Sequence, residues 1–181
     1  MHELTVLLFT DIAGSVELQQ RLGTEAYTRV IARHDELIHL AFEQSGTPPV
    51  ILKETGDGVL AKFGTASDAV NAALRIQALF AYEEWQIAKL QVRIGIHLGQ
   101  VTEMPEEITG DRRAVGMAIN LASRVMDLAE PGQILTTRSV FDDARQFISA
   151  HPPIGDATAR IPELQWPAHG RYRFKGYDTP L

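Results

Sequence analysis

The stretch that decides the fold runs from Thr5 to Ser15 and reads TVLLFTDIAGS. Its first part, Thr5 to Thr10, is a short apolar run of the kind that forms a β-strand. A carboxylate, Asp11, ends this run, and Gly14 and Ser15 then open a segment with helical spacing. The stretch therefore predicts a strand that ends at an aspartate and is followed directly by a helix.

A second aspartate stands at a comparable place in the next strand-like part of the chain. The short runs Val50–Leu52 and Val59–Phe63 are separated by a tight-turn signal around Asp57, and we expect them to form a hairpin. If the second of these runs pairs with the first strand, Asp57 and Asp11 meet at one edge of the sheet. Two carboxylates and a neighbouring backbone carbonyl suit Mg²⁺, which prefers oxygen ligands and is usually completed by substrate phosphates. The pair predicts a two-metal site for phosphate chemistry; the alternative is that Asp11 caps the helix and Asp57 serves the turn.

The remaining hydrophobic patterns extend this beginning into an α+β fold. We expect Ser15 to cap a helix that reaches Gln44, with a break at Gly23-Thr24. Alternating apolar residues from Leu90 to Val101 predict the central strand. The first half of the chain then reads β-α-β-β-α-β, which is the ferredoxin-like order. The other predicted elements are a helix at 66–84, a polar loop at 104–112, a helix at 115–128, a strand at 134–136, a short helix capped by Thr137 and ending near 147, an irregular stretch at 151–167 and a last strand at 172–175.

Composition excludes several classes of function. The chain has 181 residues, 45% hydrophobic and 22% charged, which is ordinary for one soluble globular domain spanning 1–181. The formal net charge of −6 argues against a general nucleic-acid surface. The absence of cysteine rules out disulfides and thiolate metal sites and fits the cytoplasm. Met1 to Leu4 lack the basic start of a signal peptide, and no apolar run approaches the ~20 residues of a membrane helix, so we expect no membrane insertion in this chain.

Five strings carry a resemblance to a known family. They begin at Phe9, Lys53, Arg93, Asn120 and Ala129 and read FTDIAGS, KETGDG, RIGIHLG, NLASR and AEPGQIL. In this order they resemble the catalytic domain of the class III nucleotidyl cyclases, the adenylate and guanylate cyclases, from residue 4 to residue 175. The resemblance implies a mixed sheet flanked by helices and a phosphorus–oxygen lyase that converts ATP to 3′,5′-cyclic AMP and pyrophosphate. Such domains are commonly fused to regulatory domains, so the chain can be the N-terminal part of a longer protein.

The resemblance also implies two Mg²⁺ or Mn²⁺ ions per active site, held by Asp11, Asp57 and the backbone carbonyl of Ile12. One ion lowers the pKa of the attacking ribose 3′-hydroxyl, and both neutralise charge on the triphosphate. Arg93 is expected near the aspartates and the phosphates, with an exposed strand-end charge as the alternative. Lys53 is expected to donate to the purine ring, which favours adenine because its N1 is an acceptor; the alternative is a surface lysine lying along apolar neighbours.

A predicted helix carries Asn120 and Arg124, which are four residues apart and therefore share one helix face. By resemblance, Asn120 positions the ribose and Arg124 stabilises the charge that builds on the α-phosphate in the transition state. Lys175, in the string FKG, resembles a phosphate-contacting lysine of the family. The alternatives are the polar face of an amphipathic helix for the first two and a solvated side chain for the third. We interpret His97 as structural.

One position departs from the family pattern. Counting from Gly116 and Asn120, Arg113 stands where adenylate cyclases carry the Asp or Thr that accepts from the adenine amino group. Arginine has donors only and cannot fill that role. Asp111 or Thr109 could do so if the loop were displaced, and Arg113 would then face outward. We place Arg113 in the substrate-binding set and expect weak discrimination between ATP and GTP.

The resemblance implies that each active site lies between two subunits. One subunit contributes metal-side residues and the other nucleotide-side residues, so a two-fold homodimer with two shared sites is expected to bind nucleoside triphosphate, with ATP favoured. A rival interpretation is a non-catalytic nucleotide-sensing or dimerisation module, which the departure at Arg113 favours. A diguanylate-cyclase-like domain is a more distant rival, because its glycine–glycine–acidic loop is absent. The metal-side residues are Asp11, Asp57 and Arg93, and the nucleotide-side residues are Lys53, Asn120 and Arg124.

Overall fold

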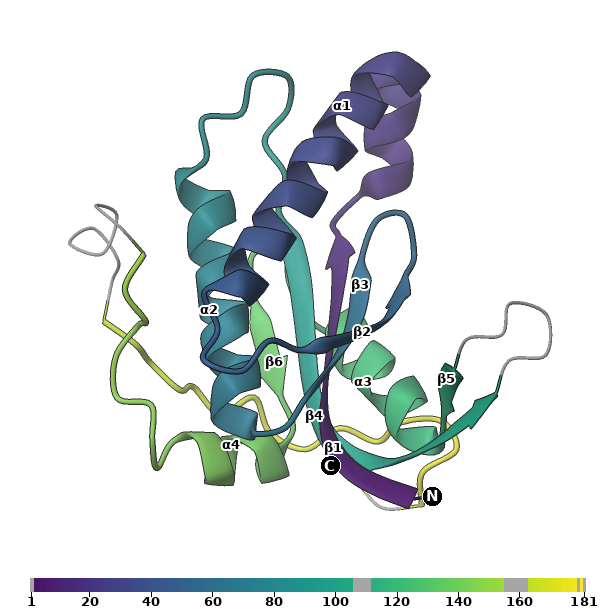
Figure 1. Ribbon diagram of the computed structural model, residues 1–181, viewed down its shortest axis with the longest axis vertical. Helices are drawn as coiled ribbons and strands as arrows, with labels where there is room; N and C mark the ends of the chain where they lie inside the picture. Colours follow the sequence, from purple (N-terminus) through teal and green to yellow (C-terminus); the bar gives the residue numbers. More distant parts are fainter. Residues whose placement is uncertain (1, 106–111, 155–162, 179, 181) are drawn as a thin grey trace.

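A mixed sheet flanked by helices makes up the fold of the chain (Figure 1). The computed structural model describes residues 2–105, 112–154, 163–178 and 180. The first six elements follow the predicted β-α-β-β-α-β order, so the α+β fold with a ferredoxin-like core is confirmed. The elements are β1 (His2–Ile12), α1 (Ser15–Glu43), β2 (Val50–Glu54), β3 (Val59–Phe63), α2 (Ala66–Tyr82), β4 (Val92–Pro105), β5 (Arg112–Val115), α3 (Met117–Asp127), β6 (Ile134–Thr136) and α4 (Arg138–Ala144).

The first strand, β1, lies at the centre of the sheet, whose order is β2-β3-β1-β4-β5. It pairs antiparallel with β3 and, over its whole length, with β4, where Asp11 lies opposite Arg93. The strand β6 joins β4 in parallel, which makes the sheet mixed. The pairing of β1 with β3 is the condition on which the predicted meeting of the two aspartates depends.

Side chains along β1 alternate between two cores. Val6 and Leu8 are buried in the larger core with residues of α1 and α2, whereas Leu7 belongs to a smaller core with residues of α3. Figure 1 shows α1 and α2 on one face of the sheet and α3 on the other. By the same alternation, Phe9 and Asp11 lie on the face that carries α3.

The helix α3 approaches β4 closely because Gly95 has no side chain. A Cβ at this position would lie 2.2 Å from the Met126 nitrogen and 2.7 Å from the Ala122 oxygen, and both are backbone atoms of α3. Gly95, the first glycine of the RIGIHLG string, therefore allows the close position of the helix that carries Asn120 and Arg124.

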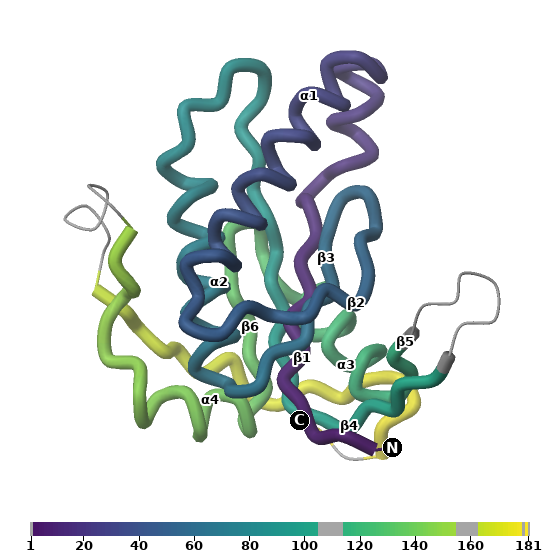
Figure 2. The backbone as a smooth tube through the Cα atoms, in the orientation of Figure 1, coloured from purple at the N-terminus to yellow at the C-terminus, as the bar shows by residue number. Residues whose placement is uncertain are grey.

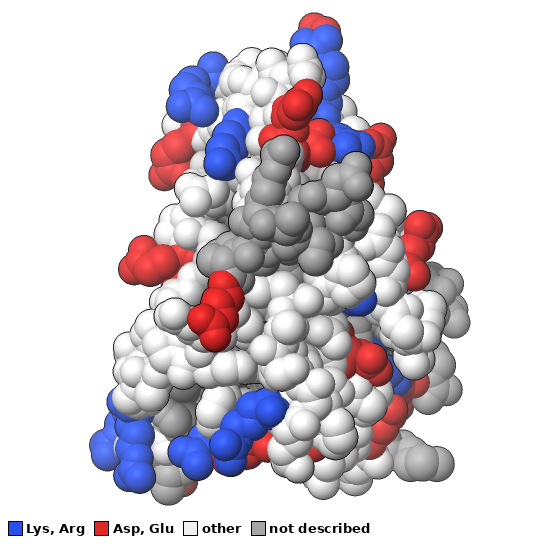
Figure 3. All heavy atoms as spheres, turned by 90° about the vertical axis from the view of Figure 1, so that its left-hand side faces the viewer, with Lys and Arg blue, Asp and Glu red and all other residues white. Residues whose placement is uncertain are grey.

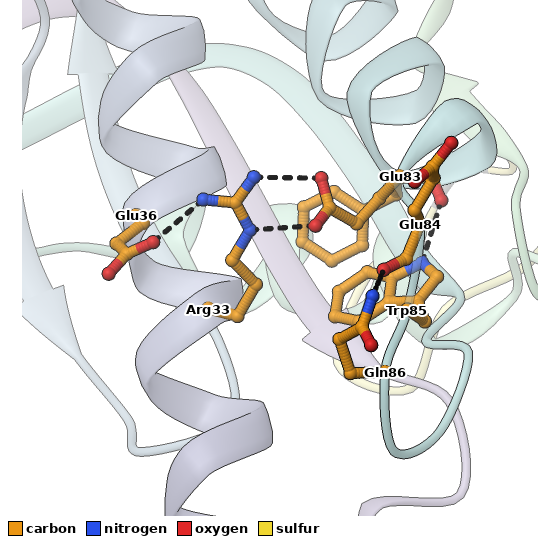
Figure 4. A network of polar contacts seen from close by, with 7 residues as sticks. Arg33, Glu36, Glu83, Glu84, Trp85 and Gln86 are labelled. Atoms are coloured by element: carbon orange, nitrogen blue, oxygen red, sulfur yellow. Dashed lines mark hydrogen bonds and ion pairs between the residues drawn. The ribbon is translucent and has the colours of Figure 1, made fainter.

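A charge network ties α1 to the end of α2 (Figure 4). Arg33 donates from Nε and Nη2 to the two carboxylate oxygens of Glu83, each at 2.8 Å, and from Nη1 to Glu36 at 2.7 Å. This two-pronged contact fixes where the loop after α2 begins. The loop ends next to β1, where the Ala13 amide donates to the Gln91 carbonyl at 2.9 Å. The loop is thus anchored at both ends beside the turn that follows Asp11.

The predicted N-cap of α1 is wrong. The cap residue is Gly14, in the left-handed conformation with φ 69°, and it makes no side-chain capping hydrogen bond. Ser15 is the first helical residue, and its hydroxyl bonds to Asp57 instead. The predicted break at Gly23 is confirmed, because this residue has non-helical angles of φ 73° and ψ 166°.

Two predictions in the second half of the chain are also wrong. The sequence predicted a loop at 104–112 and a helix from 115, but β4 continues to Pro105, and Arg112 to Val115 form the strand β5. Residues 172–175 form no strand; instead, Phe174 to Tyr177 make a turn that the Tyr177 amide closes by donating to the Phe174 carbonyl at 3.1 Å. Residues 106–111 of the predicted polar loop and 155–162 of the predicted irregular stretch lie outside the described residues.

The C-terminal segment 163–178 returns along the end of the sheet where β1 begins and passes close to α3 (Figure 2). Basic and acidic side chains both occur along the face shown in Figure 3, so no single sign of charge dominates it. None of the helices in the described ranges combines the length and the apolarity needed to cross a bilayer.

Candidate active site

The two aspartates of the site lie side by side because the β2–β3 turn is held against the end of β1. The Ile12 amide donates to the Asp57 carbonyl at 2.9 Å, and the Val59 amide donates to the Thr10 hydroxyl at 2.9 Å. A Cβ at Gly58 would lie only 2.0 Å from the Thr10 carbonyl oxygen, so no other residue fits there without a backbone shift. The predicted convergence of Asp11 and Asp57 is therefore confirmed.

Asp11 is half-buried and forms an ion pair with Arg93, its neighbour on β4. The pKa of Asp11 is raised above its ordinary value: burial is the largest cause, the hydrogen bond from Arg93 opposes it, and the charge of Asp57 raises the pKa further. The carboxylate thus stands in a place where its negative charge is costly and where added positive charge is favourable.

Within the described residues, Asp57 forms no ion pair and is held by the Ser15 hydroxyl, with the Thr55 hydroxyl nearby. The Ser15 hydroxyl donates to Oδ2 at 2.7 Å, and the Thr55 hydroxyl lies 3.5 Å from Oδ1 and donates to the Gly58 carbonyl at 3.1 Å. The sequence analysis predicted Ser15 as a helix cap and did not predict its contact with Asp57. The Ser15 bond links the start of α1 to the β2–β3 turn and limits the orientations of the Asp57 carboxylate.

This donor set fits Mg²⁺ or Mn²⁺. Within the described ranges, no group of three or more His, Cys, Asp or Glu side chains could hold a metal ion by itself. Mg²⁺ in phosphate-handling sites does not need such a group, because one or two carboxylates suffice when substrate phosphates and waters complete the shell. Asp11 and Asp57, with the backbone carbonyl of Ile12 between β1 and α1, provide that kind of incomplete site.

The structure also brings Arg124 and Lys175 together. Arg124 lies on α3, and its Nη1 donates to the backbone carbonyl of Lys175. The guanidinium carbon lies 5.8 Å from the centre of the Tyr177 ring. Asn120 is exposed one helical turn before Arg124, and the side chain of Lys175 is also exposed.

Of the two residues expected to contact the base, Lys53 is described with its side chain and Arg113 only by its backbone. Lys53 is exposed on β2, where the pairing with β3 shifts register between Ile51 and Lys53, a bulge that re-aims the strand. Arg113 lies on β5 opposite Met104, but its side chain is outside the described part, as are Asp111 and Thr109. The acceptor for an adenine amino group therefore stays a prediction.

The metal-side and nucleotide-side residues have separate polar contacts in the described part of the chain. Among the described residues, no hydrogen bond or ion pair joins a member of one set to a member of the other. A cavity of about 480 Å³ near the start of α3 is lined by His97, Met117 and Tyr177, among others, and by no residue of either set.

His97, to which the sequence analysis assigned no part in the site, contacts the residue that precedes α4. Its Nδ1 lies 3.1 Å from the Thr137 hydroxyl, which joins β4 to the start of α4. Burial lowers the pKa of His97 to about 4, so the ring is uncharged near neutral pH.

Comparison with known proteins relates this geometry to one family. A sequence model described as the adenylate and guanylate cyclase catalytic domain matches residues 1–151. An uncharacterized protein of Mycobacterium bovis is 29% identical over 175 residues, covering 96% of this chain and 52% of that protein. The adenylate cyclase of Podospora anserina is 28% identical over 151 residues, covering 72% of this chain and 7% of that protein. The chain thus spans about half or less of these relatives. The crystal structure of the adenylyl cyclase CyaB from P. aeruginosa has the same fold, with a TM-score of 0.80 and 23% identity over 99% of this chain and 91% of that one.

Proposed function

The chain belongs to the adenylate and guanylate cyclase catalytic domain family, and we propose that it is an adenylate cyclase, which converts ATP to 3′,5′-cyclic AMP and pyrophosphate. The observation that carries this proposal is the pair of aspartates at the end of β1, held together by the bond from the Ile12 amide to the Asp57 carbonyl. The choice of ATP over GTP is supported by Lys53, whose ammonium group can donate to adenine N1 but finds no acceptor at guanine N1.

Two divalent ions are part of the proposal. Asp11, Asp57 and the carbonyl of Ile12 would hold them, and added positive charge would favour the charged form of the half-buried Asp11, whose pKa is raised by burial. When bound, Mg²⁺ or Mn²⁺ lowers the pKa of the ribose 3′-hydroxyl and offsets charge on the phosphates. Arg93, already beside Asp11, adds a further positive charge on the same face of the sheet.

Three residues outside the metal site are proposed to contact the ribose and the phosphates. Arg124 donates to the α-phosphate oxygen that becomes more negative during the in-line displacement, and such a fixed donor commonly lowers the activation free energy by about 2.7–4 kcal/mol. Asn120, on the same face of α3, orients the ribose so that its 3′-hydroxyl faces the phosphorus. Lys175, whose backbone is already joined to Arg124, would direct its exposed ammonium group to the phosphates.

We propose a two-fold homodimer as the active form. The metal-side residues lie at the end of β1, whereas Arg124 and Asn120 lie on α3, and among the described residues no hydrogen bond or ion pair joins them. A second copy related by a two-fold axis can bring its α3 to the first copy's aspartates, and the same operation completes a second, equivalent site.

A non-catalytic nucleotide-binding module is the second candidate function, and the presence of Arg113 favours it. A cyclase assay separates the two. Purified protein is incubated with Mn²⁺ and ATP or GTP, and cyclic nucleotides are quantified by chromatography. We expect cyclic AMP from the wild type and a loss of about 100-fold or more in Asp57→Asn, which keeps the size of the side chain but weakens metal binding. If the nucleotide binds, as measured by calorimetry, but no cyclic product forms, the module is the correct function.

A further inference from the structure

We propose that Tyr177 is a positioning residue that holds the guanidinium of Arg124 in place for the reaction. The inference rests on the proposed function, because it gives Arg124 the task of stabilising the α-phosphate. It goes further by assigning a task to the segment that follows Lys175 and to a tyrosine that the sequence analysis left without one.

A tight turn presents a backbone carbonyl to Arg124. The turn runs from Phe174 to Tyr177 and is closed by the bond of 3.1 Å from the Tyr177 amide to the Phe174 carbonyl. Gly176 has φ +84°, a backbone conformation that residues other than glycine rarely adopt and that the third residue of a type II turn requires. The peptide between Lys175 and Gly176 carries the oxygen that accepts from Nη1 of Arg124.

Tyr177 is itself fixed at both ends of its side chain. Its hydroxyl donates to the carbonyl of Met117 at 2.7 Å, and its ring lies 5.8 Å from the guanidinium carbon of Arg124. Met117 and Arg124 are two helical turns, about 10 Å, apart along α3, so the hydroxyl contacts the start of the helix while the ring contacts the side chain of a residue further along it. The Phe174 ring meets the Tyr177 ring edge-on, with 6.5 Å between the centroids. The tyrosine therefore joins the turn to the helix rather than hanging free from the chain.

These contacts leave Arg124 able to act. Its partners among the described residues, a carbonyl and an aromatic ring, are both uncharged, so its positive charge is not cancelled by an ion pair. A guanidinium has five N–H donors, and one bond to Lys175 does not exhaust them. The contact with the Tyr177 ring, over which the guanidinium carbon lies, uses the positive charge of the group without neutralising it. The arrangement restricts the rotamers of a long side chain, which is how a donor becomes effective in the transition state.

Kinetic measurements on two substitutions and a matched control test the proposal. Tyr177→Leu removes the ring and the hydroxyl, Tyr177→Phe removes only the hydroxyl, and Tyr172→Leu alters an exposed tyrosine five residues earlier in the same segment. We expect Tyr177→Leu to lower kcat about 10- to 100-fold with KM for ATP changed less than about threefold, because a misplaced donor costs the transition state rather than binding. Tyr177→Phe should retain an intermediate kcat, and Tyr172→Leu should match the wild type.

The outcomes that overturn the proposal are distinct. An unchanged kcat in Tyr177→Leu would show that Arg124 needs no such support. A higher kcat would show that the contact restrains the enzyme. A loss in Tyr172→Leu equal to that in Tyr177→Leu would show a general disturbance of the segment.

A second readout is independent of turnover. The Nε–Hε signal of Arg124 is followed by ¹⁵N NMR in the nucleotide-free protein and identified by its loss in Arg124→Lys. We expect restricted motion in the wild type and in Tyr172→Leu, and fast motion in Tyr177→Leu. Unchanged motion in Tyr177→Leu would overturn the proposal even if kcat fell. If the wild type made no cyclic nucleotide, the proposed function would be rejected, while this signal would still decide whether Tyr177 fixes Arg124.

Discussion

Among single residues, His97 shows how burial controls charge in this domain. Its pKa is lowered to about 4, whereas an exposed histidine titrates near 6.5. The unfolded chain therefore takes up a proton as the pH falls below about 6.5, and the folded protein does not until about 4. The stability that His97 contributes is fully present above this window and is lost as the pH falls through it.

We predict that His97→Gln weakens the pH dependence of stability. Between pH 7.5 and pH 5, the free energy of unfolding of the wild type should fall by about 1–2 kcal/mol more than that of His97→Gln. Urea denaturation at both pH values measures this difference, and substitution of the exposed His39 on α1 is the control. Equal falls in the wild type and in His97→Gln would mean that the buried ring is not kept neutral.

The second prediction about a single residue concerns Arg113 and the choice between ATP and GTP. Lys53 supplies a donor for the base, and Arg113 supplies another donor where an adenine-selective site needs an acceptor. We expect the wild type to discriminate weakly between ATP and GTP, and Arg113→Asp to raise kcat/KM for ATP about tenfold or more. The ratio of kcat/KM for the two nucleotides, measured on both proteins, tests this. A wild type that strongly prefers ATP, and loses this preference in Arg113→Asp, would show that another group accepts from the amino group.

Sequence strings indicated the charged residues of the candidate site and the nearness of Arg93 to Asp11, but not the hydroxyl partners of Asp57. The convergence of Asp11 and Asp57 followed from two strand-end patterns and is confirmed. The bond from Ser15 to Asp57 was missed, because the two residues are 42 positions apart and a serine next to a glycine reads locally as a helix cap. Metal binding by the aspartates stays a prediction.

At the scale of elements, the contact between α3 and β4 leaves no room for a side chain at Gly95. A methyl group at Gly95 would meet only backbone atoms of α3, which cannot rotate away as a side chain can. We predict that Gly95→Ala destabilises the protein by about 3 kcal/mol, because the whole helix must shift. Gly64→Ala, where a Cβ meets nothing within 4 Å, should change stability by less than about 0.5 kcal/mol. Urea denaturation compares them, and equal midpoints would contradict the close contact.

The long elements and most short ones, including β3 and β6, were predicted from the sequence, whereas β5 was missed for a physical reason. The helix α1 and the strand β4 carry several repeats of their hydrophobic period, so their existence is visible in the sequence. The four residues of β5 carry too few repeats, and their pairing with β4 depends on the register of a distant strand. The predicted strand at 172–175 failed because Gly176 favours a turn whose partner is α3 rather than the sheet.

At the scale of the whole molecule, the separation of the two residue sets has a consequence for activity. One chain holds the metal-side residues at the end of β1 and holds Asn120 and Arg124 on α3, and among the described residues no hydrogen bond or ion pair joins the two sets. If each site is shared, a chain with a damaged metal side can still serve its partner's intact metal side through its own α3.

We predict that two inactive variants recover activity when mixed. Asp57→Ala damages the metal side, and Asn120→Ala damages the nucleotide side. In a heterodimer of the two, one site carries both defects and the other carries none. Random pairing at equal concentrations makes half of the dimers mixed, so about a quarter of the wild-type activity should return. The mixture of Asp57→Ala with Asp11→Ala is the matched control and should stay inactive, because every site then has a damaged metal side. Two affinity tags establish that heterodimers form; if they form and the first mixture still makes no cyclic AMP, each site is built within one chain and the shared-site arrangement is wrong.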